Sequence, residues 1–233
     1  CVPASIDNNL PGSELSIGTD TAVNSTVSTL DAIKLSASAS KRCFVAEVMG
    51  RRCGYLTLMS GLATGAEKVY LPEHDATLDE IASATSDMVK SFRDGRRLYL
   101  VLRNEAACGL YSTKLLADVF AQESHGLYDV RESVIGHVQQ GGNPTAFDRL
   151  MATRLVTNAM QVLVDELVAG TARGHYVGLV NGEFRDSPLA HMNDELDLAN
   201  RRPRDQWWLR LEHVIPVVSQ DEVAIDKSKL PPL

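Results

Sequence analysis

The sequence lacks the features of a membrane protein or of a disulfide-stabilised domain. No stretch approaches the roughly 18 consecutive apolar residues of a membrane-spanning helix, which rules out a membrane span. The four cysteines form neither a Cys-x-x-Cys pair nor a cluster with histidine: Cys1, Cys43, Cys53 and Cys108. This pattern favours reduced thiols in a cytoplasmic protein over a metal site or a disulfide framework.

Basic residues are also fewer than acidic ones, and the first residue of the sequence is not methionine. Its 23 lysines and arginines stand against 30 acidic residues, giving a net charge of -7. That balance argues against a basic surface for nucleic acid, although local basic sites remain compatible with it. The first residue is Cys1, with no methionine and no signal sequence, so we expect this sequence to be part of a longer protein.

Apolar residues recur with helical or strand-like spacing along most of the chain. The predicted helices cover residues 22–33, 56–66, 78–92, 113–123 and 146–168, with another near 189–199. The predicted strands cover residues 43–49, 68–71, 97–102, 130–138 and 176–180. Because strands alternate with helices, we expect an α/β fold of three layers, in which helices flank a mainly parallel sheet.

Polar side chains gather at four predicted strand ends, and ligands bind where the carboxyl ends of parallel strands meet. One such loop alone indicates no more than a solvated connection, but four at one edge predict a site. The loops cover residues 5–9, 49–54, 103–105 and 136–142. Asp7 can take a proton from a hydroxyl group, and arginines suit phosphate. These groups are typical of a phosphorylated-sugar site, since no serine elbow or Cys/His pair indicates a nucleophilic triad.

The same four segments, in order and spacing, resemble motifs of the 6-phosphofructokinases. They are Pro3-Ala4-Ser5-Ile6-Asp7-Asn8-Asn9-Leu10-Pro11-Gly12, Glu47-Val48-Met49-Gly50-Arg51-Arg52-Cys53-Gly54, Arg103-Asn104-Glu105 and Gly136-His137-Val138-Gln139-Gln140-Gly141-Gly142-Asn143-Pro144. The resemblance extends over roughly residues 1–200 and implies phosphorylation of fructose 6-phosphate in glycolysis. Ala4, in place of lysine, favours the ATP-dependent branch over the pyrophosphate-dependent one.

The resemblance also implies a role for individual residues. Asp7 would take the proton from the sugar 1-hydroxyl, Ser5 would lie near the transferred phosphoryl group, and Arg51 would lie near the nucleotide phosphates. Sugar contacts would come from residues that hold the fructose ring or face the 6-phosphate: Met49, Gly50, Glu105, His137 and Gln140. Arg42 and Arg131 would reach the site of a neighbouring subunit in a homo- or hetero-oligomer, and Lys34 would contact an allosteric effector.

The sequence departs from the family pattern in two residues and in one missing region. Asn9 stands where active halves have a second carboxylate, and Gln140 stands where they have arginine, which weakens phosphate binding. The family's glycine-rich phosphate loop and magnesium motif would lie upstream. We therefore predict no metal ligand in this sequence, and we expect ATP and Mg2+ to be held mostly outside it.

These departures leave two interpretations open. The chain is either part of an ATP-dependent 6-phosphofructokinase, inactive as an isolated fragment, or a non-catalytic regulatory half that binds fructose 2,6-bisphosphate or another sugar phosphate. Asn9 and Gln140 favour regulation, whereas Asp7 favours catalysis. In either case we expect residues 1–175 to form the fructose-phosphate-binding domain. Residues 176–233 would add a strand, helices and an extended arm, over 214–233, returning toward the nucleotide domain.

Overall fold

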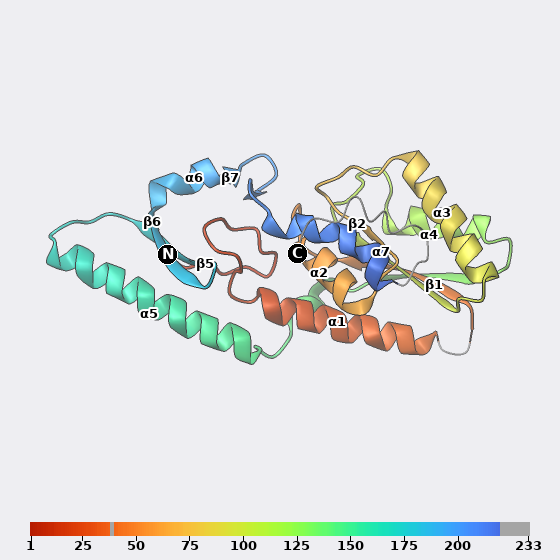
Figure 1. Cartoon of the computed structure of the whole chain (residues 1–233), viewed down its shortest axis with the longest axis horizontal. Coiled ribbons are helices and arrows are strands. Elements are labelled where there is room, and N and C mark those ends of the chain that lie inside the picture. Colours follow the sequence, from red (N-terminus) through yellow and green to blue (C-terminus); the bar gives the residue numbers. More distant parts are fainter. Residues whose placement is uncertain (38–39, 220–233) are drawn as a thin grey trace.

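The computed structural model describes residues 1–37 and 40–219 (Figure 1). Its largest sheet has four parallel strands in the order β2-β3-β1-β4. They are β1 (Arg42–Val48), β2 (Lys68–Tyr70), β3 (Leu98–Asn104) and β4 (Asp129–Val134). The central strands β1 and β3 are short apolar runs, as a sheet covered on both faces requires.

Side chains of β1 alternate between two hydrophobic cores, one on each face of the sheet. Phe44, Ala46 and Val48 belong to the first core, which α1 (Thr19–Ser36) and α2 (Tyr55–Thr64) cover. Cys43 and Val45 belong to the second, under helices α3 (Leu78–Arg93) and α4 (Thr113–Glu123). The predicted three-layer α/β fold with a parallel sheet is therefore confirmed.

Local capping explains where α3 and α4 begin. Thr77 and Glu80 form a capping box, in which the Thr77 hydroxyl accepts from the Glu80 amide and the Glu80 carboxylate accepts from the Thr77 amide. The Ser112 hydroxyl accepts from the amide of Leu115 at 3.2 Å and caps α4, as the sequence predicts.

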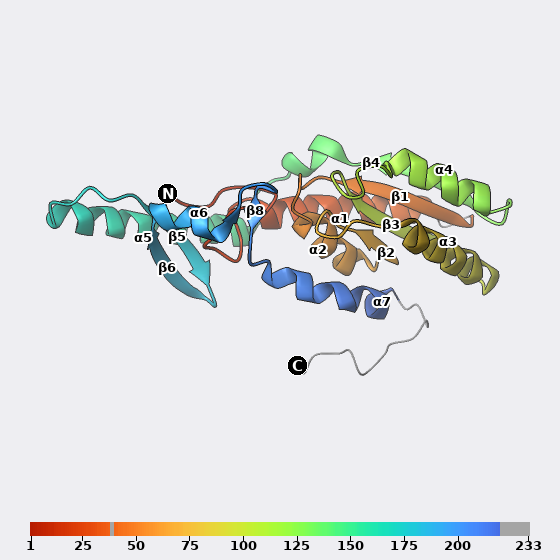
Figure 2. The same ribbon diagram turned by 90° about the horizontal axis from the view of Figure 1, so that it is seen from above.

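A second, smaller unit lies away from the sheet, as both overall views show (Figures 1 and 2). Helix α5 (Ala146–Val168) packs against an antiparallel hairpin of β5 (His175–Val180) and β6 (Glu183–Pro188), around a core that includes Met151, Leu155 and Val177. The strand predicted over 176–180 is therefore present, but it pairs with β6, which the sequence pattern did not predict.

Two predicted elements differ from the structure. The strand predicted over 130–138 ends at Val134, because Gly136 adopts a φ of 60° and begins the 3-10 helix η1 (Gly136–Gln140). The helix predicted near 189–199 is divided into η2 (Leu189–His191), α6 (Met192–Glu195) and the short strand β7 (Leu196–Asp197). There Asp197 accepts hydrogen bonds from the amides of Ala199 and Asn200, which favours a turn over a continued helix.

The C-terminal part of the chain returns to the sheet. After β8 (Arg202–Pro203), η3 (Trp207–Val214) and α7 (Ile215–Val218) follow, with Trp208 and Ile215 in the core beside α2. The arm predicted over 214–233 lies mostly outside the described residues.

Helix length, helix polarity and thiol burial complete the picture of the described residues. Within residues 1–37 and 40–219, every helix is too short or too polar to cross a bilayer. The four cysteines are free thiols, of which only Cys1 is exposed. Burial raises the pKa of the Cys53 thiol to about 12, so this group is neutral at physiological pH.

Candidate functional site

The carboxyl ends of β1, β3 and β4 meet at one edge of the sheet, as their parallel pairing requires. Residues 49–54 follow β1, residues 105–112 follow β3, and residues 135–145 follow β4. The loop at residues 5–16 joins them, because Cys53 Sγ lies 3.7 Å from the Asn8 carbonyl oxygen. Polar loops that the sequence separates by up to about 130 residues therefore share one edge of the sheet, as predicted.

The loop over residues 5–16 is shaped by the buried side chain of Asn8. Asn8 has a φ of 54°, accepts a hydrogen bond from the Ser16 amide at 2.8 Å and donates one to the Glu14 carbonyl at 2.9 Å. The Ser5 hydroxyl donates to Asn9 Oδ1 at 2.7 Å and accepts from the Asp7 amide at 3.2 Å. Asn9 therefore orients Ser5, and both flank Asp7.

Asp7 is a buried carboxylate with one cationic neighbour. It is 8% exposed, and its Oδ2 lies 3.7 Å from Arg51 Nε. Burial raises the pKa of Asp7 above its usual value; Arg51 opposes this effect and the charge of Glu105 adds to it. The carboxylate is thereby made a better proton acceptor than an exposed aspartate.

Glu105 fixes the backbone turn after β1. Its Oε1 accepts hydrogen bonds from the amides of Gly50 at 3.2 Å and Arg51 at 2.7 Å. A side chain at Gly50 would place its Cβ 2.4 Å from the Cys53 carbonyl oxygen, and the residue has a φ of 138°. Asn104 Nδ2 donates to that same carbonyl at 3.2 Å. The turn thus presents Met49, which is half-buried, and the exposed Arg51 beside Asp7.

His137 and Gln140 lie on η1 with exposed side chains. Between them, Gln139 is buried, accepts from the Thr26 hydroxyl of α1 at 3.1 Å and donates to the Gly136 carbonyl at 3.1 Å. Gln139 therefore holds η1 against α1 and leaves its two neighbours free to contact a ligand.

Arg42 lies at the end of the sheet opposite the loops around Asp7, and Arg131 lies midway along β4 with its guanidinium 3.7 Å from the Asp129 carboxylate. Arg42 begins β1 and pairs in register with Asp129, and Arg131 pairs with Phe44. The path from Arg42 to Val48 is roughly 20 Å at about 3.3 Å per residue. The structure therefore does not bring these arginines together with Asp7 within one chain.

Lys34, the predicted effector contact, lies in the last turn of α1. Its Nζ donates to the Thr64 carbonyl at the end of α2, at 2.6 Å. This places Lys34 away from the loops around Asp7, and its effector role stays a prediction.

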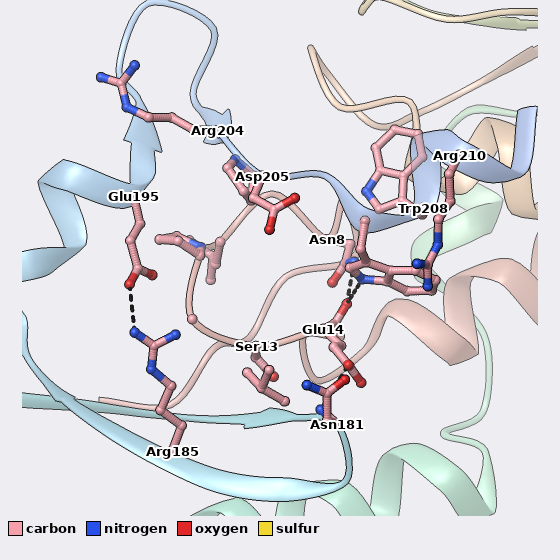
Figure 3. Close-up of a pocket in the computed structure, with 16 residues that line it drawn as sticks. Asn8, Ser13, Glu14, Asn181, Arg185, Glu195, Arg204, Asp205, Trp208 and Arg210 are labelled. Atoms are coloured by element: carbon pink, nitrogen blue, oxygen red, sulfur yellow. Dashed lines mark hydrogen bonds and ion pairs between the residues drawn. The ribbon is translucent and has the colours of Figure 1, made fainter. Parts of the chain in front are cut away.

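Among the described residues, pockets adjoin the loop of residues 5–16 on two sides, and neither was predicted from the sequence. The smaller, about 370 Å³ and here termed the arginine pocket, is lined by Asn9, Arg51, Arg52, Ala199, Asn200 and Arg201. The larger, about 650 Å³, lies between residues 8–14, the β5–β6 hairpin and residues 203–210 (Figure 3). Trp207 and Trp208 form part of its wall, and Arg185 pairs with Glu195 across 3.2 Å at its rim. No group of three or more His, Cys, Asp or Glu residues suited to a metal occurs in the part of the chain that the structure describes.

Comparison with known proteins identifies the family. The model of the phosphofructokinase family matches residues 1–163. An ATP-dependent 6-phosphofructokinase of Dictyostelium discoideum is 42% identical over 90% of this chain and 25% of its own length. The human muscle-type enzyme is 35% identical over 97% of this chain and 30% of its own length. The structure of phosphofructokinase from Saccharomyces cerevisiae aligns with a TM-score of 0.87 at 29% identity, covering 94% of this chain and 32% of that one.

This chain is therefore an α/β protein whose polar loops gather at the carboxyl edge of a parallel sheet, and the comparisons assign it to a family. The chain belongs to the phosphofructokinase family. It spans about a quarter to a third of the length of the relatives that it matches.

Proposed function

We propose that this chain carries the sugar-phosphate site of an ATP-dependent 6-phosphofructokinase. The observation that carries the proposal is the buried Asp7, whose raised pKa suits a general base. Asp7 takes the proton of the sugar 1-hydroxyl while that oxygen forms a bond to the γ-phosphorus of ATP. The bond from that phosphorus to the bridging oxygen breaks, and ADP leaves.

The other predicted residues take positions around this proton transfer. Ser5 lies within the same loop, and the cation of Arg51 neutralises charge on the transferred phosphoryl group. The fructose ring contacts Met49, Gly50 and Glu105. Of the two Glu105 carboxylate oxygens, Oε2 makes this contact, because Oε1 already accepts hydrogen bonds from the amides of Gly50 and Arg51. The 6-phosphate is bound by exposed groups on η1, His137 and Gln140.

ATP and Mg2+ are assigned to residues outside this sequence. Asp7 stands beside two amides, Asn8 and Asn9, so its loop supplies a single carboxylate, and that carboxylate already faces the Arg51 guanidinium. Mg2+ would neutralise charge on the nucleotide phosphates during transfer.

We further propose that the site is shared between subunits of a cytoplasmic, glycolytic oligomer. Arg131 is exposed on the edge strand β4, and Arg42 begins the neighbouring strand. Because Arg42 lies at the far end of β1 from the Asp7 of its own chain and Arg131 is exposed midway along the edge strand, both suit a phosphate bound in an adjacent subunit.

The alternative function, a regulatory site for fructose 2,6-bisphosphate, is favoured by the arginine pocket. Three arginines, Arg51, Arg52 and Arg201, line this pocket and suit a phosphate group. Fructose 2,6-bisphosphate has a second phosphate, on carbon 2, that fructose 6-phosphate lacks. Asn9 also supports this alternative, because its amide oxygen is engaged by Ser5 and bears no charge.

The experiment that separates the two functions is Asp7→Ser in the full-length protein. Loss of a general base lowers turnover by roughly 10²–10⁴-fold. Sugar affinity, measured by titration with fructose 6-phosphate with and without ATP, should change little. Asp118→Ser on the exposed face of α4 is the control. Unchanged turnover in Asp7→Ser would assign this region to regulation, and the same titration with fructose 2,6-bisphosphate would then identify its ligand.

A further inference from the structure

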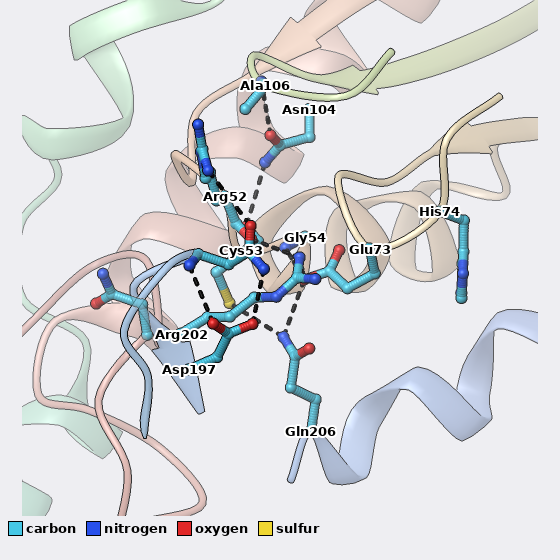
Figure 4. Close-up of polar contacts among 12 residues, drawn as sticks. Arg52, Cys53, Gly54, Glu73, His74, Asn104, Ala106, Asp197, Arg202 and Gln206 are labelled. Carbon is cyan, nitrogen blue, oxygen red and sulfur yellow. Dashed lines mark hydrogen bonds and ion pairs between the residues drawn. The ribbon is translucent and has the colours of Figure 1, made fainter. Parts of the chain in front are cut away.

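Glu73 is a buried carboxylate that no part of the proposed reaction uses. It follows β2, and its side chain is 2% exposed. Its Oε1 accepts from the Gly54 amide at 3.0 Å and from Gln206 Nε2 at 2.9 Å, and it lies 3.1 Å from Arg202 Nη1 (Figure 4). We term these four residues the Glu73 clasp.

The clasp joins two segments that are far apart in the sequence. Gly54 ends the turn that carries Arg51 and Arg52, whereas Arg202 and Gln206 belong to the returning C-terminal segment. Arg202 Nη1 also donates to the Arg52 carbonyl at 2.8 Å. A single guanidinium, 13% exposed, therefore contacts both the buried carboxylate and the backbone of the turn.

The arginine pocket lies directly beside this junction. One wall is formed by Arg51 and Arg52 of the turn, and the other by residues 199–201. Arg52 Nη1 crosses between the walls, donating to the Ala199 carbonyl at 3.2 Å and to Asn200 Oδ1 at 3.3 Å. The distance between the walls, and so between Arg51 and Arg201, depends on how residues 197–206 are held against the turn.

Gly54 shows that the carboxylate approaches the turn closely. A Cβ at this position would lie 2.6 Å from Glu73 Oε2, which has no hydrogen-bond partner within the described residues. A buried carboxylate with only one oxygen engaged is costly unless its charge is balanced, and Arg202 is the cation that balances it. Removing either partner should therefore move the C-terminal segment.

We propose that Glu73 and Arg202 are positioning residues that set the spacing of the arginine pocket and thereby its preference for sugar bisphosphates over sugar monophosphates. This inference rests on the second function proposed above, a sugar-phosphate site that takes fructose 2,6-bisphosphate. It assigns the 2-phosphate, which only the bisphosphate carries, to the arginine pocket. The 6-phosphate and the fructose ring, which both sugars have, are bound outside the pocket, on η1 and in the turn after β1. Loss of the clasp then affects the bisphosphate selectively.

The test is titration of the full-length protein with fructose 2,6-bisphosphate and with fructose 6-phosphate, by calorimetry. Glu73→Gln, Arg202→Met and the double variant are compared with the wild type. Each single variant should weaken bisphosphate binding roughly tenfold, the scale of one lost contact to a charged group, and monophosphate binding less than threefold. The double variant should resemble the singles, because both substitutions break one junction.

A destabilised control separates positioning from general loss of stability. Phe92→Leu, in the core between the sheet and α3, lowers stability without touching the clasp, and it should leave the ratio of the two affinities unchanged. Equal weakening of both ligands in the clasp variants, or no weakening, would overturn the proposal. Failure of the wild type to bind either sugar would instead overturn the proposed function, and the clasp proposal with it.

Discussion

Glu105 Oε1 accepts hydrogen bonds from two successive backbone amides, that of Gly50 being 3.2 Å away. One carboxylate from the end of β3 thereby determines the path of the chain after β1. Because the turn packs against Asn104 as well, its backbone has little freedom to adjust.

We therefore expect Gly50→Ala to lower both stability and sugar binding. The new Cβ would meet the Cys53 carbonyl oxygen at 2.4 Å, and the φ of 138° would strain any L residue. The free energy of unfolding should fall by roughly 2–5 kcal/mol, measured by urea denaturation. Gly95→Ala is the matched control: its φ is 104° but nothing lies within 4 Å, so only backbone strain of roughly 1–2 kcal/mol applies. Equal losses in both variants would show that the close contact contributes nothing.

Asp7→Asn should stabilise the protein at neutral pH while it removes the proposed base. Because burial raises the pKa of Asp7, the folded state disfavours its charged form. The protonated form of Asp7 therefore stabilises the folded state. This contribution is complete at pH values below the pKa of the unfolded chain, and it is lost as pH rises through the raised pKa of the folded state. The midpoint of urea denaturation of Asp7→Asn should exceed that of the wild type at pH 7, and the difference should vanish below about pH 3.8. A lower midpoint at pH 7 would indicate that the pairing with Arg51 outweighs the cost of burial.

The same pKa shift predicts the acid limb of turnover in the full-length protein. Only the deprotonated carboxylate can accept a proton, so the rate should decline as pH falls toward a pKa above 3.8. Arg51→Met removes the charge that opposes the shift, so it should move this limb to higher pH. If the acid limb does not move in Arg51→Met, the group that titrates there is not Asp7.

Helix α1 depends on a carboxylate from α5. Asp148 is buried and accepts from the amides of Gly18 at 2.9 Å and Thr21 at 2.8 Å, as well as from the Thr21 hydroxyl. Asp148→Ala would leave these partly buried donors without their protein partner and should cost roughly 2–4 kcal/mol in the free energy of unfolding. Asp148→Asn keeps an acceptor oxygen and should cost about half as much. Equal unfolding free energies for the wild type and Asp148→Ala would mean that water replaces the cap.

The sequence was sufficient to predict the sheet and the loops at its carboxyl edge. Strands β1 and β3 are short apolar runs, and parallel topology alone brings the ends of such strands together. The clasp could not be predicted in this way, because Glu73 and Gln206 are 133 residues apart and no periodicity links them. For the same reason, the charged residues around Arg202 predicted only a solvent-exposed segment, although the structure half-buries Arg202 against Glu73.

Errors at the element ends have local causes. A single glycine in a left-handed conformation ended the strand predicted through residue 138, and its φ could not be read from the apolar pattern. Near residue 197 a side-chain carboxylate bonded to backbone amides and replaced the expected helix. Both are cases in which turn chemistry outweighs hydrophobic periodicity.

Subunit sharing can be tested by mixing variants of the full-length protein that are each impaired in turnover. Arg131→Met subunits retain Asp7, and Asp7→Asn subunits retain Arg131. The smallest assembly that can share sites between subunits is a dimer, and a mixed dimer contains one site with both residues intact. Reassociation at equal amounts should restore roughly a quarter of wild-type turnover, because half of the dimers are mixed and each has one complete site. In the control mixture, Asp7→Asn with Arg51→Met, both altered residues serve the site of their own chain, where they lie 3.7 Å apart. Turnover there should not rise above that of the two variants measured alone. Equal recovery in the two mixtures, or none in the first despite confirmed mixed dimers, would refute the assignment of Arg131 to a neighbouring site.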